Sequence, residues 1–412
     1  MSMGSQRDAL IGHFLKTGIR QASVTVLNLI STIFIAKLLG PENMGFLATL
    51  MVSTGLIATV FSFGFSSGLV YYLPQGGVDV RHATDVTHVI SFGTLILVIF
   101  CGFFFYLSDF VSEPLLAGFL ALQIFFICCR TNYTGLLLGL RRYNEMNLIS
   151  LIGAVLKSLL VISFYLSGVT ISVSLALFVY LCDDFICLML IFFRHLPRRI
   201  PSFQEGRDVV LKCVAYGWQV HFSNFVLSLL YRADIYLLQA FSGLGQAGIY
   251  NFALQVSEKS WLPSQAMSTI MLPEFVAEKS RVHIEEGLRK ILWLSAIGTT
   301  VLASIAPLGI YILVNFVGKG FWESVEVSFW LIPGMVAMGV GRIYMNFLAS
   351  QGRPLANIKI ILFSLFVNVV LDLFLIPRYG AVGAAIGSSL AYCCFWMLSR
   401  RKASRFLAES QL

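Results

Sequence analysis

Charged side chains lie inside long apolar segments of this sequence, where they could bind an anionic group. Five basic residues fall well within such segments: Arg20, Arg130, Arg232, Lys259 and Arg342. A charge at the centre of a membrane-spanning helix costs about 2.5–3.5 kcal/mol on insertion scales. We therefore expect these side chains to line a water-filled cavity and bind an anionic substrate. The alternative for each is an ion pair with an acid on another helix.

A second set of polar residues could hold a small cation. Asn368 and Asp372 are four residues apart and share one face of a helix, and Ser388 follows the turn at Pro377. If the segment carrying Asp234 packs against this hairpin, the side-chain oxygens form a cage suited to a hard cation rather than a transition metal. We expect a coupling ion, either sodium or a proton, at Asp234, Asn368, Asp372 and Ser388. The alternative is that Asp234 pairs with an arginine and Asp372 belongs to a local polar network.

Two further acids and one lysine lie at similar depth. Asp183 and Asp184 are neighbours, so on a helix their side chains point about 100° apart, and at most one can face a given cavity. Lys157 is equally deep, and nothing near it in the sequence indicates a partner.

The elements that must position these residues are membrane helices. The chain is 57% hydrophobic and 12% charged, with a mean hydropathy of +0.81, whereas soluble domains have about 25% charged residues. Its apolar runs are continuous rather than alternating, which favours spanning helices over a barrel. The net charge of +8 is assigned to loops that orient the protein, so no nucleic-acid partner is expected.

The pattern predicts an all-α integral membrane protein with twelve transmembrane helices in two six-helix lobes. The lobes comprise residues 1–200 and 201–412, with the polar stretch Arg194–Lys212 as the linker. Lysine and arginine crowd the loops of one side, which places both termini in the cytoplasm. The loops are too short for a catalytic domain, so we expect no enzyme, and no GxxxxGK[ST] motif indicates ATP binding.

The two halves resemble each other weakly. Gly45, in the turn Gly-Pro-Glu-Asn-Met-Gly, aligns with Gly248 at an offset of 203 residues. A second similarity relates the segment Gly139–Asn144 to the segment Gln351–Pro354. Because each half has an even number of spans, the repeats are parallel and related by a pseudo-two-fold axis. Such halves rocking about a central site are the geometry of alternating-access transporters.

Local features predict how some helices pack and bend. The pairs Gly64/Gly68 and Gly383/Gly387 have the small-xxx-small spacing of close helix contacts. We assign these contacts to packing within a lobe, so a monomer is expected. Pro263, just after Glu258 and Lys259, predicts a kink beside charged residues, as a gate requires.

Three stretches resemble a known family. They are Thr17–Leu50, the pattern Arg232–Asp234 followed by Gly248–Tyr250, and the run Asn368–Ala385. All three are similar to the Wzx-type polysaccharide flippases, which export O-antigen and exopolysaccharide units. These proteins belong to the multidrug/oligosaccharidyl-lipid/polysaccharide (MOP) exporter superfamily. The resemblance covers essentially the whole chain.

The resemblance implies a substrate and a compartment. The substrate would be an undecaprenyl-pyrophosphate-linked oligosaccharide, moved from the cytoplasmic to the periplasmic leaflet of a bacterial inner membrane through a cationic cavity. Arginine suits such a cavity because its planar fork can grip phosphate oxygens. Some superfamily members have a sodium site in the second lobe, and no other cofactor is implied. Expected partners are membrane lipid and the polymerase and chain-length proteins of the pathway; the glycan stays open.

Two alternatives remain. A multidrug/cation antiporter of the same superfamily is disfavoured because the deep charges are mainly basic. A membrane polysaccharide polymerase or glycosyltransferase would need catalytic residues on sizeable external loops, and the loops here are short.

Overall fold

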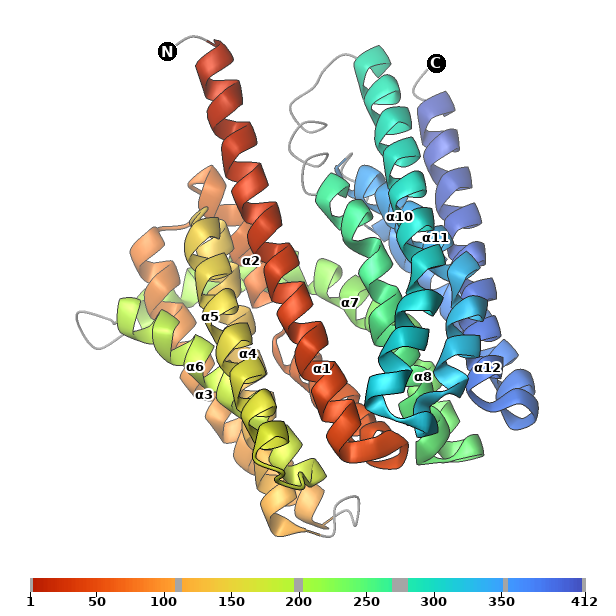
Figure 1. Ribbon diagram of the computed structural model, residues 1–412. Coiled ribbons are helices and arrows are strands. Elements are labelled where there is room, and N and C mark those ends of the chain that lie inside the picture. Colours follow the sequence, from red (N-terminus) through yellow and green to blue (C-terminus); the bar gives the residue numbers. More distant parts are fainter. Residues whose placement is uncertain (1–2, 108–112, 196–202, 269–280, 351–354, 410–412) are drawn as a thin grey trace. The chain divides into compact units, whose positions relative to one another are not determined.

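The computed structural model describes residues 3–107, 113–195, 203–268, 281–350 and 355–409, and every regular element in these ranges is helical (Figure 1). The longer helices are α1 (Met3–Phe61), α3 (Val80–Leu107), α4 (Pro114–Gly139), α5 (Tyr143–Leu166), α6 (Val173–Arg194), α7 (Phe203–Ser242), α10 (Arg281–Val317), α11 (Glu323–Ser350) and α12 (Leu355–Glu409). The shorter ones are α2 (Phe65–Tyr72), α8 (Leu244–Ser257) and the 3-10 turns η1 (Leu73–Gln75), η2 (Glu258–Trp261) and η3 (Lys319–Phe321).

The protein is an all-helical, multi-pass membrane protein. Within the described ranges, eight helices are long and apolar enough to cross a bilayer. Two of them contain a backbone break at a glycine, Gly40 in α1 with φ of 72° and Gly380 in α12 with φ of 54°. Glycine adopts such positive φ values without a Cβ penalty, so each of these helices is broken by a kink where the sequence has Gly-Pro or Pro-x-x-Gly. Parts of the predicted linker (196–202) and of the second similarity (351–354) lie outside the described residues.

The chain divides into two compact units. The first comprises Met1–Ile35 and Leu50–His221, and the second comprises Ala36–Thr49 and Phe222–Leu412. Helices α1 and α7 therefore contribute residues to both units. The sequence-based division into 1–200 and 201–412 stays a prediction, because compactness alone does not define independent domains.

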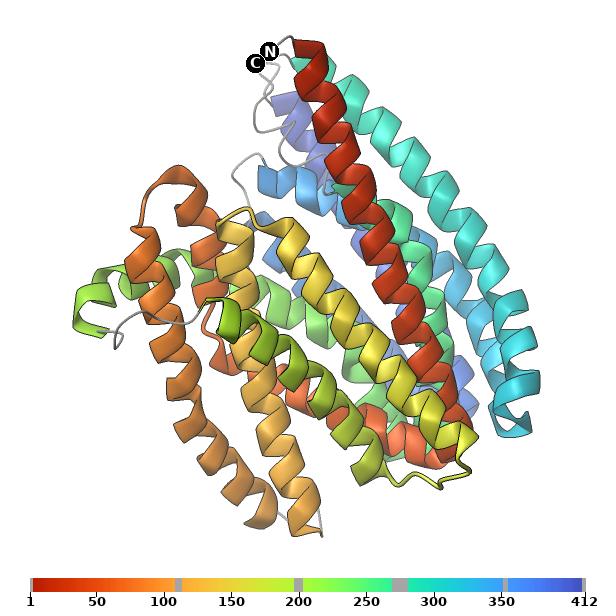
Figure 2. The ribbon, with the colours of Figure 1, turned by 60° about the vertical axis from the view of Figure 1, so that its left-hand side comes forward.

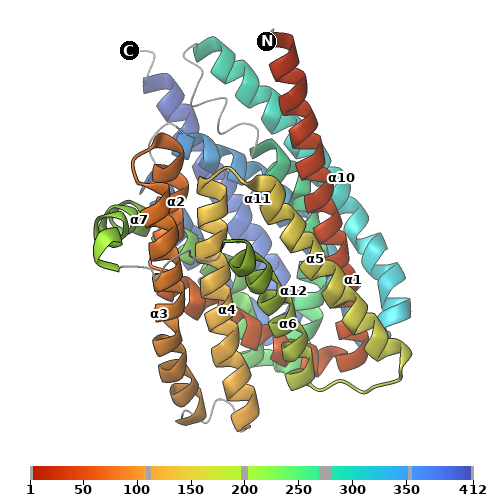
Figure 3. The same ribbon diagram turned by 90° about the vertical axis from the view of Figure 1, so that its left-hand side faces the viewer.

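In the first unit, α3 packs on α4 (Figure 3) and α5 packs on α6 (Figure 2). Short helix α2 contacts both α4 and α7 through glycines, which lets backbones approach closely. A Cβ added at Gly68 would overlap Cys213 of α7, and one at Gly135 of α4 would overlap Ser66. Gly64 likewise abuts the backbone of Gly217. The close contacts predicted for Gly64/Gly68 therefore lie within the first compact unit, but they cross the boundary at residue 200 predicted between the lobes.

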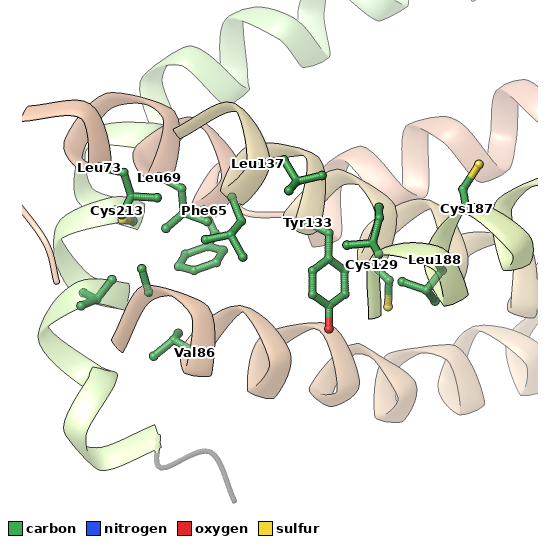
Figure 4. Packing of buried hydrophobic residues seen from close by; sticks show 14 of the residues in the cluster. Phe65, Leu69, Leu73, Val86, Cys129, Tyr133, Leu137, Cys187, Leu188 and Cys213 are labelled. Atoms are coloured by element: carbon green, nitrogen blue, oxygen red, sulfur yellow. The ribbon is translucent and has the colours of Figure 1, made fainter. Parts of the chain in front are cut away.

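The core of this unit is a cluster of buried side chains from helices α2 to α7 (Figure 4). The ring of Tyr133 extends from α4, and its hydroxyl is directed toward α3. There it lies 2.5 Å from His88 Nδ1, while Nε2 of the same imidazole lies 2.9 Å from the carbonyl oxygen of His195. A phenol buried among apolar side chains needs such a polar partner.

In the second unit, α11 packs against both α10 and the α12 hairpin (Figure 1). The segment of α1 in this unit makes a reciprocal contact with α8. A Cβ at Gly45 would overlap the carbonyl oxygen of Leu244, and a Cβ at Gly248 would overlap that of Pro41. Both pairs are related by the offset of 203 residues expected from the sequence. The two stretches thus pack backbone to backbone with local two-fold symmetry.

The kink predicted near Pro263 coincides with an interruption of the α-helix. Helix α8 ends at Ser257, the 3-10 turn η2 follows over Glu258–Trp261, and residues 262–268 are helical again. A 3-10 stretch within a helix often marks a hinge. This break lies beside the charged residues described next.

Candidate functional site

Arg232 and Asp234 leave opposite faces of α7, because two residues correspond to a rotation of about 200° on a helix. Arg232 meets Glu258 of η2, and Asp234 meets Tyr250 of α8 and Ser388 of α12. One helix thus contributes to two separate groups of polar side chains in the second unit.

The first group, the carboxylate cluster, consists of Asp234, Tyr250, Asn368, Asp372 and Ser388. The Asp234 Oδ2 atom accepts hydrogen bonds from the Tyr250 hydroxyl and from Ser388 Oγ, the latter at 3.0 Å. The Tyr250 and Ser388 hydroxyl oxygens lie 3.1 Å apart. Every member is fully buried, with no side-chain exposure. Burying a carboxylate is costly unless it is paired or hydrogen-bonded, and Asp234 meets that condition.

The other half of the carboxylate cluster is incompletely hydrogen-bonded. Asn368 Nδ2 donates to Asp372 Oδ2 at 3.1 Å. The Asp372 Oδ1 atom lies against Gly387, where an added Cβ would overlap it, and Gly387 is the neighbour of Ser388. Within the described residues, Asp372 Oδ1 and Asn368 Oδ1 have no hydrogen-bond donor. Two buried acceptors without donors, beside two carboxylates, favour a proton or a hard cation at this place.

The structure therefore brings together the four residues predicted to hold a coupling ion: Asp234, Asn368, Asp372 and Ser388. Their role stays a prediction. In the described part of the chain no three His, Cys, Asp or Glu side chains converge as a metal site, so a sodium ion here would rely partly on amide and hydroxyl oxygens. The sequence reasoning missed Tyr250. Its signal was a phenol in an apolar helix, which must find a polar partner once buried.

The second group, the cationic cluster, consists of Arg232, Glu258, Lys259 and Arg342. Arg232 forms a two-pronged ion pair with Glu258, with nitrogen–oxygen distances of 2.8 and 3.0 Å. The Arg342 guanidinium lies over the ring of Trp261, 5.5 Å from its centroid. Among the described residues, no carboxylate lies within ion-pair distance of Lys259 or Arg342. With three cations and one carboxylate, the cluster has an excess of two positive charges.

The two remaining predicted basic residues lie in the first unit. Arg20 Nη1 donates to the Asn144 side chain at 3.2 Å and reaches its carbonyl oxygen at 3.4 Å. Arg130 of α4 pairs with Asp184 of α6 at 2.5 Å, and Gln123 Nε2 donates to the other Asp184 oxygen at 2.6 Å. For Arg130 and Arg232 the structure thus has the interhelical ion pair that the sequence left as the alternative.

The neighbouring acids of α6 diverge as expected. Asp184 faces Arg130, whereas Asp183 pairs with Lys157 of α5 at 2.8 Å. Only Asp184 contributes to the wall of the pocket that contains Arg130. The Lys157–Asp183 pair is almost completely buried, at 7% and 10% exposure, and provides the partner that the sequence did not reveal for Lys157.

The fold is similar to that of solved transporters of the MOP superfamily. It is similar to an inward-facing multidrug resistance MATE family transporter, with a TM-score of 0.75 and 15% identity over 94% of this chain and 95% of the other. It is also similar to the lipid II flippase MurJ, with a TM-score of 0.74 and 14% identity over 95% of this chain and 87% of that one. The predicted superfamily resemblance is therefore confirmed at the level of the fold.

The chain belongs to the polysaccharide biosynthesis protein family, whose model matches residues 16–271. It is also similar to the uncharacterized membrane protein MJ1375 of Methanocaldococcus jannaschii. The two are 24% identical over 386 residues, which cover 86% of this chain and 88% of that protein. A second membrane protein of the same archaeon, MJ1068, is 22% identical over 197 residues, covering 47% of this chain and 39% of its own length.

Proposed function

We propose that the protein is a flippase for an undecaprenyl-pyrophosphate-linked oligosaccharide, such as an O-antigen or exopolysaccharide repeat unit. It moves this lipid from the cytoplasmic to the periplasmic leaflet by cation-coupled alternating access. The family and the fold both support a transporter of the polysaccharide pathway. The observation that carries the substrate class is the excess positive charge of the cationic cluster, which lies among apolar helices.

A pyrophosphate cannot cross the hydrocarbon unaided, because transferring its charges there costs on the order of tens of kcal/mol. Arg232 is already neutralised by Glu258. The charges left to attract the headgroup are Lys259 and Arg342 beside η2, and Arg20 in the first unit. Of the five basic residues selected from the sequence, these three are therefore the strongest candidates for phosphate contact. Their excess positive charge disfavours the alternative of an antiporter for cationic drugs.

The test uses the purified full chain in proteoliposomes containing a fluorescent undecaprenyl-pyrophosphate oligosaccharide, with leaflet exchange followed by impermeant dithionite. We expect Lys259→Gln and Arg342→Gln each to slow flipping at least tenfold, equivalent to about 1.4 kcal/mol. The control is Lys290→Gln, which removes an exposed lysine and should leave the rate unchanged. Normal flipping by both test variants would refute the site. Uptake of a cationic dye without any flipping would favour the antiporter, and polymerisation of the oligosaccharide would favour the polymerase.

The carboxylate cluster is our candidate for the coupling site. Asp234 and Asp372 are both buried in one polar group, and two like charges buried together are unfavourable without a counter-charge. A sodium ion or a proton would supply that counter-charge and satisfy the free Asp372 and Asn368 oxygens. Asp234 and Asp372 would bind the ion, while Asn368 and Ser388 would orient it.

Coupling is tested by flipping under a sodium gradient and, separately, under a proton gradient. Wild-type protein should respond to only one of the two gradients. Asp234→Asn should abolish that response, because the amide cannot exchange the ion, while slow downhill flipping persists. A variant that retains full gradient-driven flipping would exclude Asp234 from coupling.

We further propose twelve crossings in two related six-helix lobes, since the breaks at Gly40 and Gly380 divide two of the apolar helices. The reciprocal Gly45–Gly248 contact supports a pseudo-two-fold relation between the halves. The proposed location is a bacterial inner membrane with both termini in the cytoplasm, where the polymerase and chain-length proteins of the pathway would be partners.

A further inference from the structure

A pocket in the first unit has a composition that differs from both clusters of the second. It has a volume of about 480 Å³ and opens between α2, α4 and α6, which is within the range of roughly 300–1,000 Å³ usual for small-molecule sites. Its polar wall consists of Ser66, Ser67, Thr131, Thr134 and the pair Arg130–Asp184. The remaining wall is apolar.

The two helices that carry the hydroxyl groups are held together by glycine. At Gly135 an added Cβ would overlap Ser66, and at Gly139 it would overlap the carbonyl oxygen of Leu69. This close approach sets the hydroxyls of α2 opposite those of α4. The pocket is therefore shaped by backbone contacts, which do not depend on a flexible side chain.

The pocket has no net charge. Arg130 and Asp184 cancel each other at 2.5 Å, and Gln123 occupies the second Asp184 oxygen. The pair keeps 32% and 11% exposure, so donor and acceptor atoms both face the opening. A pyrophosphate would meet the Asp184 carboxylate and be repelled. A neutral ligand with many hydroxyl groups can donate to Asp184 and accept from Arg130 at the same time.

The four hydroxyls are also available. In the membrane helices of this protein many serine and threonine side chains donate to their own helix, as Thr25 does to the carbonyl of Gln21 and Thr59 to that of Gly55. Within the described residues, the hydroxyl groups of Ser66, Ser67, Thr131 and Thr134 form no hydrogen bond, and all four residues are partly exposed. These four hydroxyl groups are therefore free to bind a ligand beside the Arg130–Asp184 ion pair, whose net charge is zero.

From this we infer that the α2–α4–α6 pocket binds a neutral sugar unit of the transported glycan, at a position separate from the pyrophosphate site. The inference rests on the proposed function, which it deepens by dividing the substrate between two places. The hydroxyls of the pocket bind ring hydroxyls, and the Arg130–Asp184 pair recognises a donor and an acceptor on the same sugar.

The test compares two probes on the full-length protein in nanodiscs: undecaprenyl pyrophosphate carrying a neutral oligosaccharide, and undecaprenyl pyrophosphate alone. Thr131→Val/Thr134→Val should weaken binding of the first probe about tenfold, as expected for two lost neutral hydrogen bonds. Binding of the second probe should be unchanged. The control Thr25→Val removes a hydroxyl that its own helix satisfies, and it should affect neither probe.

A second variant keeps the inference testable if the threonine pair is poorly folded. Asp184→Asn leaves Arg130 uncompensated, so it should strengthen binding of the sugar-free probe and weaken that of the glycosylated one. Equal weakening of both probes by the threonine variant, or no change with either, would overturn the sugar site while leaving the flippase intact. If the wild type binds neither probe, the proposed function itself fails, and the sugar site fails with it.

Discussion

At the scale of single residues, the ion pairs of this protein differ in how strongly they can contribute to stability. The Lys157–Asp183 pair is nearly inaccessible to solvent, whereas Arg142 is half exposed and lies 3.7 Å from Glu145. Surface pairs contribute about 0–1 kcal/mol, but removing one partner of a buried pair leaves an uncompensated charge. Stability measurements should separate the two cases.

We predict that Lys157→Met lowers the unfolding free energy by about 3 kcal/mol, because Asp183 stays buried without its partner. The double variant Lys157→Met/Asp183→Leu should regain most of that loss, since no isolated charge remains. Arg142→Gln is the control and should change stability by less than about 1 kcal/mol. SDS titration of the purified protein measures all three, and a double variant as unstable as the single one would contradict the interpretation.

Gly387 is a second position at which a single added methyl group should change both stability and coupling. Ala at this position would overlap Asp372 Oδ1, so the carboxylate must leave its place beside Ser388. We predict that Gly387→Ala lowers stability by about 1–3 kcal/mol and removes the response of flipping to the coupling gradient. The control is Gly309→Ala in α10, where no atom lies within 4 Å. A Gly387→Ala variant with normal coupling would show that Asp372 does not need its present position.

Sequence reasoning at this scale grouped the polar residues of one hairpin but did not identify the ion-pair partners of the deep basic residues. Asp234, Asn368, Asp372 and Ser388 could be grouped because a hairpin brings residues of known spacing together. The partners of Lys157 and Arg130 are 26 and 54 residues away on other helices. A helix that is apolar all round gives no signal for the direction in which each face points, so these pairs were not predictable.

At the scale of elements, breaks and close contacts were predictable because glycine and proline act locally. The turns at Gly40 and Gly380, the 3-10 break at Glu258–Trp261 and the packing of Gly64 and Gly68 all coincide with such residues. The packing of α2 against α4 through Gly135 was not predicted. Its partner is a serine on a separate helix, and sequence spacing does not indicate which helix faces a glycine.

The reciprocal contact between α1 and α8 gives an element-scale prediction. Gly45→Ala and Gly248→Ala should each lower stability by about 1–3 kcal/mol, because the new methyl group meets a backbone carbonyl that cannot rotate away. The double variant should lose less stability than the two single variants added together, since separating the helices for one methyl group makes room for the other. Thermal unfolding in detergent measures this effect.

The matched control for this contact is Gly55→Ala, also in α1, where no atom lies within 4 Å. It should be neutral or slightly stabilising, because alanine favours a helix over glycine by about 1 kcal/mol. If Gly45→Ala behaved like Gly55→Ala, the two helices would not be in backbone contact.

At the scale of the whole molecule, hydropathy and charge were sufficient to predict the class of protein from the sequence. Continuous apolar segments and sparse charge indicate a helical membrane protein, and the fold agrees. The number of crossings is harder to derive. Only eight helices satisfy length and hydropathy together within the described residues. Helices α1 and α12 each contain a turn and count once, the polar residues of α7 lower its hydropathy, and α8 has only 14 residues before the 3-10 turn.

Twelve crossings predict which positions face each side of the membrane. In a chain whose cysteines are replaced by alanine, Ser167→Cys and Tyr379→Cys should react with an impermeant maleimide added to intact cells. Gln75→Cys and Arg401→Cys should react only after the cells are opened. All four positions are exposed: Ser167, Gln75 and Tyr379 at or beside turns, and Arg401 in the last turns of α12. Labelling therefore reports sidedness rather than burial. Labelling of Gln75→Cys from outside would contradict the topology.

The mutual carbonyl–glycine contact of Pro41 with Gly248 and of Leu244 with Gly45 also restricts how the gene can change. An inserted or deleted residue in either stretch would shift one carbonyl away from its glycine and bring the other into collision. Both faults would appear at once, because each stretch supplies one half of both contacts. Two regions encoded some six hundred nucleotides apart are therefore under a shared constraint on length.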